Sequence, residues 1–267
     1  MLPRFSHGYH NPALDQLFQH MLGEPPARAR ALTRDWYRNR GRARNMWRHC
    51  AEAPADSIGE RANRIALPGA DALAQFLTRD SGTGLVLLTM HLGDYLYAIY
   101  RLLSLAPARD VVILRRKAGT DEEQACFAKL SSLGHNVATV RHSSRAAALL
   151  VGHLRRGAIA VLLFDLPARW GETREVTFLS QVMYWVEGPL ILAAAGNARV
   201  IPFFAPRIEG VPHCLMMPTL DYSRGSGDLP SEHQQLCDAA SHVVRQWPSQ
   251  WHHWHLVPEM MAPSSHG

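Results

Sequence analysis

Residues 84–94 read Gly-Leu-Val-Leu-Leu-Thr-Met-His-Leu-Gly-Asp, an apolar run that ends in a histidine, a glycine and an acid. Five of the six residues from Leu85 to Met90 are large and apolar, which is typical of a strand buried on both faces. A parallel strand of this kind presents functional groups at its carboxyl end, where His91 stands. From Tyr95 onward apolar residues recur at helical spacing, so we expect His91 in a strand-to-helix turn. In that turn His91 is either an exposed general base or a cap of the helix.

Strands and helices alternate along the rest of the chain. Such alternation predicts an α/β fold with a mostly parallel central sheet flanked by helices. We expect one domain over residues 1–258 and a disordered tail over 259–267. Residues 1–26, the loop around Pro54 and Gly59, and a turn-rich segment after residue 165 carry no predicted element. The expected strands span 63–67, 84–90, 110–115, 136–141, 158–165, 199–206 and 213–220, and the expected helices span 27–50, 70–79, 94–105, 121–133, 144–156, 187–196 and 231–247.

The composition is that of a globular protein. Of its 267 residues, 47% are hydrophobic and 19% are charged. The longest apolar stretch, around 158–166, has the length of a strand rather than of a membrane span, and the first residues lack a signal-peptide core. The simplest location is therefore the cytoplasm. The four cysteines have no metal-type or redox-type spacing and are expected to be reduced thiols.

Arginine is concentrated near the N-terminus. Eight arginines fall between Arg28 and Arg48, interleaved with Trp36, Tyr37 and Trp47, in a chain of net charge +5. Arginine with interfacial aromatics suits an anionic membrane surface or a phosphate-bearing partner, and it also suits nucleic acid. The alternative is a solvated helix face with the tryptophans packed inward. Because nucleic-acid binding would depend on this helix alone, we do not expect a nucleic-acid partner.

Six short motifs follow one another on this alternation of strands and helices. They are Arg-Asp-Trp-Tyr-Arg-Asn-Arg-Gly (34–41), His-Leu-Gly-Asp-Tyr (91–95), Leu-Arg-Arg (114–116), Leu-Arg-Arg-Gly (154–157) with Leu-Phe-Asp (163–165), Gly-Pro (188–189) with Val-Ile-Pro-Phe (200–203), and Gln-Trp-Pro-Ser-Gln-Trp-His-His-Trp (246–254). In this order they resemble the motifs of the lysophospholipid acyltransferase superfamily. The resemblance is closest to its late lipid A branch of lauroyl and myristoyl transferases, and it covers most of the chain.

The resemblance implies acyl transfer from acyl carrier protein or coenzyme A to a hydroxyl, with His91 as general base. In the family an acid five residues after the motif histidine orients the imidazole, whereas this chain has Leu96 there. Asp94 would share a face with His91 if the helix starts near residue 92, and it could then replace the family acid. The alternatives are that Asp94 caps the helix, that another acid such as Asp165 reaches His91, that His91 acts alone, or that the site is inactive.

The resemblance also assigns further residues to the site. Arg115 matches the family arginine that stabilises negative charge near the thioester or an acceptor phosphate, and Arg116 competes with it for that place. Either arginine could instead pair with a surface acid. Asp165 matches an acid at the end of a buried strand, where it binds substrate or positions loops. Gly188 and Pro189 open a predicted helix, and together with Arg116 and Asp165 they are the expected substrate-binding residues.

Signals for other chemistry are weak. His252, His253 and His255 lie close together, but a zinc site needs a further ligand at a suitable spacing, and the interleaved tryptophans favour a packed strand. The sequence contains no Gly-x-Ser-x-Gly elbow, no P-loop and no dinucleotide fingerprint. We therefore expect neither a metal nor a cofactor.

The first functional hypothesis is an acyltransferase that moves an acyl group from an acyl carrier protein or coenzyme A thioester to a hydroxyl or an amine. Two kinds of contact fit this hypothesis. Residues 27–50 could bind peripherally to the inner face of an anionic membrane, and the basic surface could meet an acidic carrier protein. A second possibility is hydrolysis of the same thioesters. A third is a non-catalytic member of the family that binds an acyl carrier or a lipid.

Overall fold

A computed structural model describes residues 11–79, 81–115, 121–141, 143, 145–223 and 227–262, with the backbone alone at residues 115, 121 and 141. Short 3-10 helices lie at Lys129–Leu133, Ala168–Trp170, Pro248–Gln250 and Trp254–Leu256. The α-helices are α1 (Pro12–Leu22), α2 (Pro26–Glu52), α3 (Ala55–Asn63), α4 (Ala70–Arg79), α5 (Tyr95–Leu105), α6 (Asp121–Ala128), α7 (Ala146–Arg155), α8 (Gly188–Ala195), α9 (Leu229–Gln246) and α10 (Val257–Met260). The strands are β1 (Leu85–Thr89), β2 (Asp110–Arg115), β3 (Asn136–Arg141), β4 (Ile159–Leu163), β5 (Thr173–Phe178), β6 (Gln181–Val186), β7 (Arg199–Phe204), β8 (Arg207–Ile208), β9 (Val211–Pro212), β10 (Leu215–Met216) and β11 (Leu220–Asp221).

The central sheet is seven-stranded and mostly parallel, which confirms the predicted α/β fold class. Its order is β10-β7-β1-β4-β2-β3, and β11 also pairs with β7. The five strands β7, β1, β4, β2 and β3 run parallel, whereas β10 and β11 pair antiparallel with β7. β1 therefore lies between β4 and β7, and the carboxyl ends of these three strands meet at one edge of the sheet.

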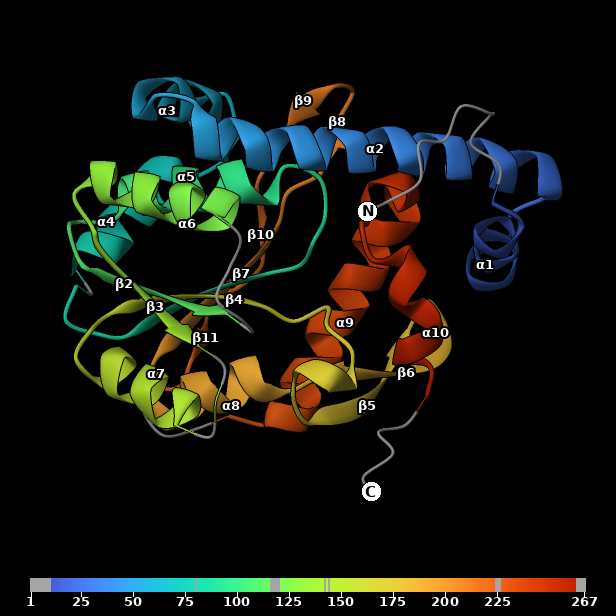
Figure 1. Cartoon of the computed structure of the whole chain (residues 1–267). Helices are drawn as coiled ribbons and strands as arrows, with labels where there is room; N and C mark the ends of the chain where they lie inside the picture. The colour runs from blue at the N-terminus through green and yellow to red at the C-terminus, as the bar shows by residue number, and fades with distance from the viewer. Residues whose placement is uncertain are drawn as a thin grey trace.

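Alternate residues of each central strand face opposite layers of helices. In β1, Val86 and Leu88 join one apolar core, while Leu85 and Leu87 join the other. The first core packs under α1, the N-terminal half of α2 and α7 to α10; the second packs under α3 to α6 and the C-terminal end of α2. Figure 1 shows α5 and α6 on one side of the sheet and α7 and α8 on the other. Burial on both faces explains why the strand is apolar at nearly every position.

Several segments expected to be irregular are ordered. α1 begins where prolines suggested no element, because Asn11 accepts a hydrogen bond from the Leu14 amide and Pro12 occupies the first turn. α3 replaces the expected loop around Gly59, and the strand expected at 63–67 is reduced to one bridge between Ala66 and His213. The turn-rich segment after residue 165 contains the antiparallel β5–β6 hairpin. The strand expected at 213–220 is split into β10 and β11, and the expected tail begins inside α10, with residues 263–267 outside the described ranges.

The arginine-rich segment is the long helix α2, whose tryptophans face inward. Trp36 Nε1 donates to the Trp251 carbonyl at 2.8 Å, and Trp47 Nε1 donates to Tyr95 Oη at 2.9 Å. All eight arginines of α2 are exposed, which gives the helix a basic outer face. The helix runs along one side of the molecule (Figure 1). No helix in the described ranges combines the length and the hydrophobicity that crossing a bilayer requires.

Candidate active site

The register of two neighbouring strands brings His91 and Asp165 together. β1 and β4 pair in parallel from Leu85 opposite Ile159 to Thr89 opposite Leu163. Two residues beyond each strand, the same register sets His91 opposite Asp165. The carboxylate accepts two hydrogen bonds from the histidine, one from Nδ1 to Oδ1 at 2.9 Å and one from the backbone amide to Oδ2 at 2.9 Å. These two contacts fix both the position and the tautomer of the imidazole, with the Nδ1 proton toward Asp165.

Asp165 is fully buried and surrounded by donors. Trp251 Nε1 donates to Oδ2 at 2.9 Å, and His253 Nδ1 lies 3.0 Å from the backbone carbonyl of Asp165 and 3.4 Å from Oδ2. Burial raises the pKa of Asp165, but the electrostatic interactions with the His91 and His253 rings and the hydrogen bonds from His91 and Trp251 lower it, and the net shift is downward. The group is therefore a carboxylate at neutral pH.

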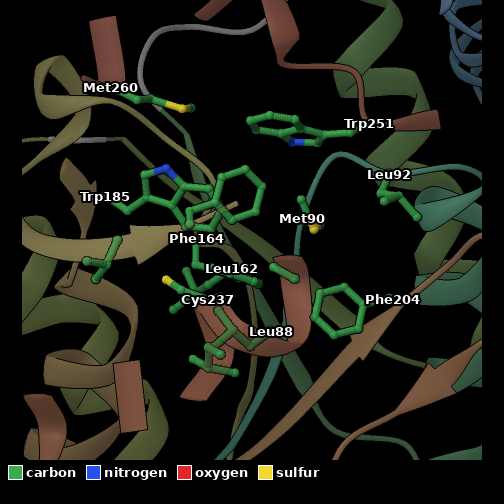
Figure 2. Close-up of a cluster of buried hydrophobic side chains, with 14 of the residues drawn as sticks. Leu88, Met90, Leu92, Leu162, Phe164, Trp185, Phe204, Cys237, Trp251 and Met260 are labelled. Atoms are coloured by element: carbon green, nitrogen blue, oxygen red, sulfur yellow. The ribbon is translucent and has the colours of Figure 1, made fainter. Parts of the chain in front are cut away.

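An apolar cluster covers the inner side of this junction. Figure 2 shows Trp251 above Met90 and Phe164, with Trp185 and Leu92 on opposite sides of them. Phe178 and Trp254 also pack on the Trp251 ring, at centroid distances of 5.2 and 5.1 Å. Water is excluded from this side, so the field of the Asp165 carboxylate acts on its hydrogen-bonded partners in a medium of low dielectric constant.

The His91 imidazole keeps one nitrogen available. Its side chain is 22% exposed, and within the described ranges no hydrogen bond engages Nε2. The Tyr95 and His253 rings flank the imidazole at centroid distances of 5.3 and 4.0 Å. A ring held on three sides, with an anion at Nδ1 and a lone pair at Nε2, can take a proton from an incoming group.

Asp94 lies on the other side of β1. Its Oδ2 forms an ion pair with Arg207 Nε at 2.7 Å, and its backbone amide donates to the Ala205 carbonyl at 2.8 Å. Burial raises the pKa of Asp94, and the Arg207 charge opposes that rise. The expectation that Asp94 shares a face with His91 and takes the place of the family acid does not match this geometry. The carboxylate bonded to His91 is the rival that the sequence offered, Asp165.

The glycine between His91 and Asp94 explains how the two side chains diverge. Gly93 has a φ of +58°, and a Cβ on it would lie 2.0 Å from the Ala205 carbonyl oxygen. Its amide donates to the Gln250 carbonyl at 3.1 Å. The turn is thus pressed between the segment after β7 and the C-terminal segment, a conformation and a closeness that only glycine allows.

The other predicted site residues are Arg115, Arg116, Gly188 and Pro189. Arg115 is the last residue of β2, and its backbone pairs with residue 141 of β3; its side chain and the whole of Arg116 are outside the described part of the chain. Gly188 and Pro189 form the first turn of α8. That helix starts near Asp165, because the Val186 amide donates to the Leu166 carbonyl at 3.2 Å.

The C-terminal segment contributes more to the site than its sequence suggested. The His252 amide donates to the His91 carbonyl at 2.8 Å, and Trp251 bridges to Leu92. Burial lowers the pKa of His252 to about 3 and that of His253 to about 3, so both rings are neutral at pH 7. The segment forms turns and short helices rather than the packed strand we expected. Three histidines within four residues were the available signal, and only the fold shows that His253 faces His91.

Ligand geometry adds a second possibility at the same place. His91, Asp165 and His253 each offer a nitrogen or oxygen atom within 4.8 Å of the others, an arrangement that could hold a metal ion. The site therefore combines a buried carboxylate, an imidazole that is oriented by it and has a free Nε2, and a second imidazole close beside the first. Proton transfer and metal binding are the two kinds of chemistry that such a set supports. No family model matches the chain, and no curated protein matches it either.

Proposed function

We propose that this chain is an acyltransferase that moves an acyl group from an acyl carrier protein or coenzyme A thioester to a hydroxyl or amine. The observation that carries the proposal is the hydrogen bond between His91 Nδ1 and the buried Asp165 carboxylate at the carboxyl edge of the sheet. The substrate class comes from the resemblance of the six ordered motifs to late lipid A acyltransferases. We also propose that the α/β fold is the version found in glycerolipid acyltransferases.

In the first step His91 acts as general base. Asp165 accepts the Nδ1 proton in a hydrogen bond, so the Nε2 lone pair is available to the acceptor hydroxyl or amine. As the acceptor oxygen or nitrogen bonds to the thioester carbonyl carbon, its proton passes to Nε2. The fixed carboxylate stabilises the imidazolium that forms, as in the serine-hydrolase arrangement.

In the second step the tetrahedral intermediate collapses. The carbon–sulfur bond breaks, the electron pair leaves with sulfur, and Nε2 returns its proton to the thiolate. The products are an ester or amide and the free thiol of the carrier. His91 and Asp165 end in the state in which they began, so one dyad serves both steps.

The His91–Asp165 pair would take the role of the family's histidine and acid, which lie five residues apart in sequence. Leu96, at the position of the family acid, is buried in the apolar core on the α5 side of the sheet. The acid comes instead from the end of the neighbouring strand, and its hydrogen bond to Nδ1 supplies the same orientation and the same charge stabilisation. In this proposal His91 has a carboxylate partner, Asp165, although Leu96 stands where the family has its acid.

The basic face of α2 suits the proposed donors and surfaces. Its eight arginines are exposed, and Arg38 forms an ion pair with Asp35 at 2.6 Å. Such a face would speed encounter with an acidic carrier protein or with the phosphates of coenzyme A. It would also support reversible contact with an anionic membrane surface on the cytoplasmic side.

A thioester-consumption assay tests the proposal. Purified chain is incubated with a panel of acyl carrier protein and coenzyme A donors and candidate acceptors, with free thiol and acylated product both measured. We expect turnover by the wild type and a loss of about 10²–10⁴-fold in His91→Ala. The matched control is His20→Ala, an exposed histidine of α1 that has no contact with His91 or Asp165, which should keep full activity. An inactive wild type across the panel, or an active His91→Ala, contradicts the proposal, and thiol release without acylated product indicates hydrolysis.

A further inference from the structure

We propose that His91, Asp165 and His253 form a binding site for a divalent transition-metal cation such as Zn²⁺. Two imidazole nitrogens and one carboxylate oxygen are the ligand types that zinc prefers when it keeps an open position. In the chain's order the three ligands come from the turn after β1, the end of β4 and the C-terminal segment. No spacing in the sequence reports such a set, because only the fold brings the three segments together.

The distances fit a tetrahedral ion. With metal–ligand bonds of about 2.0–2.1 Å, two ligands of a tetrahedral zinc lie about 3.3 Å apart. His91 Nδ1 lies 2.9 Å from one oxygen of Asp165, and His253 Nδ1 lies 3.4 Å from the other. All three ligand atoms fall within 4.8 Å of one another, and the two rings lie at a centroid distance of 4.0 Å with their planes tilted by 34°. Small side-chain movements would therefore complete the set.

The carboxylate is already held as metal-binding carboxylates are. Asp165 Oδ2 accepts from Trp251 Nε1 and from the His91 backbone amide, both at 2.9 Å. Such contacts from outside the ligand set fix a ligand's orientation and strengthen metal binding. The side chains of His91 and His253 are 22% and 14% exposed, so the ion has an entry path and a position for water.

Metal binding requires a change of tautomer and no net loss of protons. In the metal-free form the Nδ1 protons of His91 and His253 point at Asp165, at its carboxylate and its backbone carbonyl respectively. When the ion takes their place, each imidazole carries its proton on Nε2 instead. The cost is two hydrogen bonds to Asp165, and the gain is two metal–nitrogen bonds and one metal–oxygen bond.

The bound ion and the general base would exclude one another. A His91 ring that carries its proton on Nε2 has no lone pair left for an acceptor hydroxyl, and the ion occupies the carboxylate that supports it. Metal binding would then switch off acyl transfer reversibly. This consequence rests on the proposed function, whereas the binding site itself does not.

Binding is tested on the chelator-stripped, desalted full chain by calorimetric titration with Zn²⁺ and by the visible absorption of added Co²⁺. We expect one ion per chain, with a Co²⁺ spectrum typical of a four-coordinate site. His253→Gln and Asp165→Asn should each weaken Zn²⁺ binding by at least about tenfold. The matched control is His255→Gln, an exposed histidine of the same segment outside the ligand set, which should bind as the wild type does. Circular dichroism confirms that each variant is folded.

Three results would overturn the site: no uptake by the wild type, unchanged affinity in His253→Gln, or an equal loss in His255→Gln. The Co²⁺ spectrum of the wild type keeps the test decisive if a variant fails to fold, because a six-coordinate, water-like spectrum contradicts the ligand set directly. Thioester consumption is then measured with and without Zn²⁺. An active chain that binds no Zn²⁺ contradicts the metal site alone, and a chain that binds Zn²⁺ but never consumes thioester contradicts the proposed function alone.

Discussion

Two aspartates stand on opposite sides of β1, and they are held in different ways. Asp165, beyond β4, is fully buried and accepts hydrogen bonds from His91 and the Trp251 indole. Asp94, beyond β1 itself, turns toward the β7 side and pairs with the guanidinium of Arg207, which is 34% exposed. The first carboxylate faces a group that can move a proton. The second faces a guanidinium, which is a hydrogen-bond donor only.

The comparison shows that closeness along the chain does not decide which acid bonds to the motif histidine. Asp94 is three residues from His91 and Asp165 is 74, yet the hydrogen bond goes to the distant one. Parallel register sets that pairing, since His91 and Asp165 each stand two residues beyond the paired ends of β1 and β4, Thr89 and Leu163. One junction therefore has the geometry that the proposed proton transfer needs, and the other closes a turn.

The largest expected difference between the two acids is in activity. Asp165→Asn should lower thioester turnover about 10²–10⁴-fold, because the amide cannot stabilise the imidazolium and can present its N–H to Nδ1. Asp94→Asn should change turnover by less than about tenfold, since its carboxylate contacts Arg207 and not His91. Initial rates with a single thioester donor measure both. Equal losses in the two variants would show that the two junctions act as one.

The fold was predictable from the sequence in its repeating part. Apolar runs such as residues 85–90 identify strands because a strand between two helix layers must be apolar on both faces. The β5–β6 hairpin was missed because its turn residues, Leu179 and Ser180, both adopt positive φ without the Asn-Gly type of signal. α1 was missed because Pro12 suggested a break, although proline is favourable in a first turn.

Of the candidate site, the sequence could predict the place of the histidine but not its partners. His91 follows directly after an apolar run, so a local pattern is enough to place it at the end of a strand. The choice of Asp165 over Asp94 depends on strand order, which apolar runs do not specify, since β4 lies beside β1 although two other strands separate them in sequence. The contribution of His253 depends on a C-terminal segment that is anchored through Trp36 of α2 and through Leu92.

The turn that connects His91 to Asp94 should be sensitive to substitution at Gly93. Gly93→Ala should cost about 3 kcal/mol of unfolding free energy or more, because a Cβ would lie 2.0 Å from the Ala205 carbonyl oxygen at a φ of +58°. The matched control is Gly59→Ala inside α3, where a Cβ meets no atom within 4 Å. That variant should be more stable by up to about 1 kcal/mol. Urea unfolding followed by circular dichroism measures both, and a Gly93→Ala variant as stable as wild type would contradict the close approach.

The Asp94–Arg207 ion pair should contribute modestly to stability and should not affect thioester turnover. In a double-mutant cycle of Asp94→Asn and Arg207→Gln, we expect a coupling free energy of about 1 kcal/mol, because the pair is partly shielded on the aspartate side and open on the arginine side. Gln250 bonds to the backbone of residue 207, so that segment keeps its anchor in the variants. A coupling free energy near zero would mean that the ion pair does not stabilise the fold. A turnover that falls together with the coupling would mean that the pair contributes to the candidate active site.

The smallest effect, and the one that separates the two acids by sign, is in the pH dependence of stability. The pKa of Asp165 is lowered by folding, so its stabilisation is present above the unfolded pKa of about 3.9 and is lost as the pH falls through the folded value. The pKa of Asp94 is raised by burial, so its contribution is complete below about pH 3.9 and declines as the pH rises through its folded value. In the presence of a chelator, the stability deficit of Asp165→Asn should therefore grow as the pH rises from 3 to 7. The difference between Asp94→Asn and wild type should shift in favour of the variant over the same range. Urea unfolding midpoints along that pH series measure both trends, and parallel slopes would mean that the Arg207 cation, and not burial, dominates the environment of Asp94.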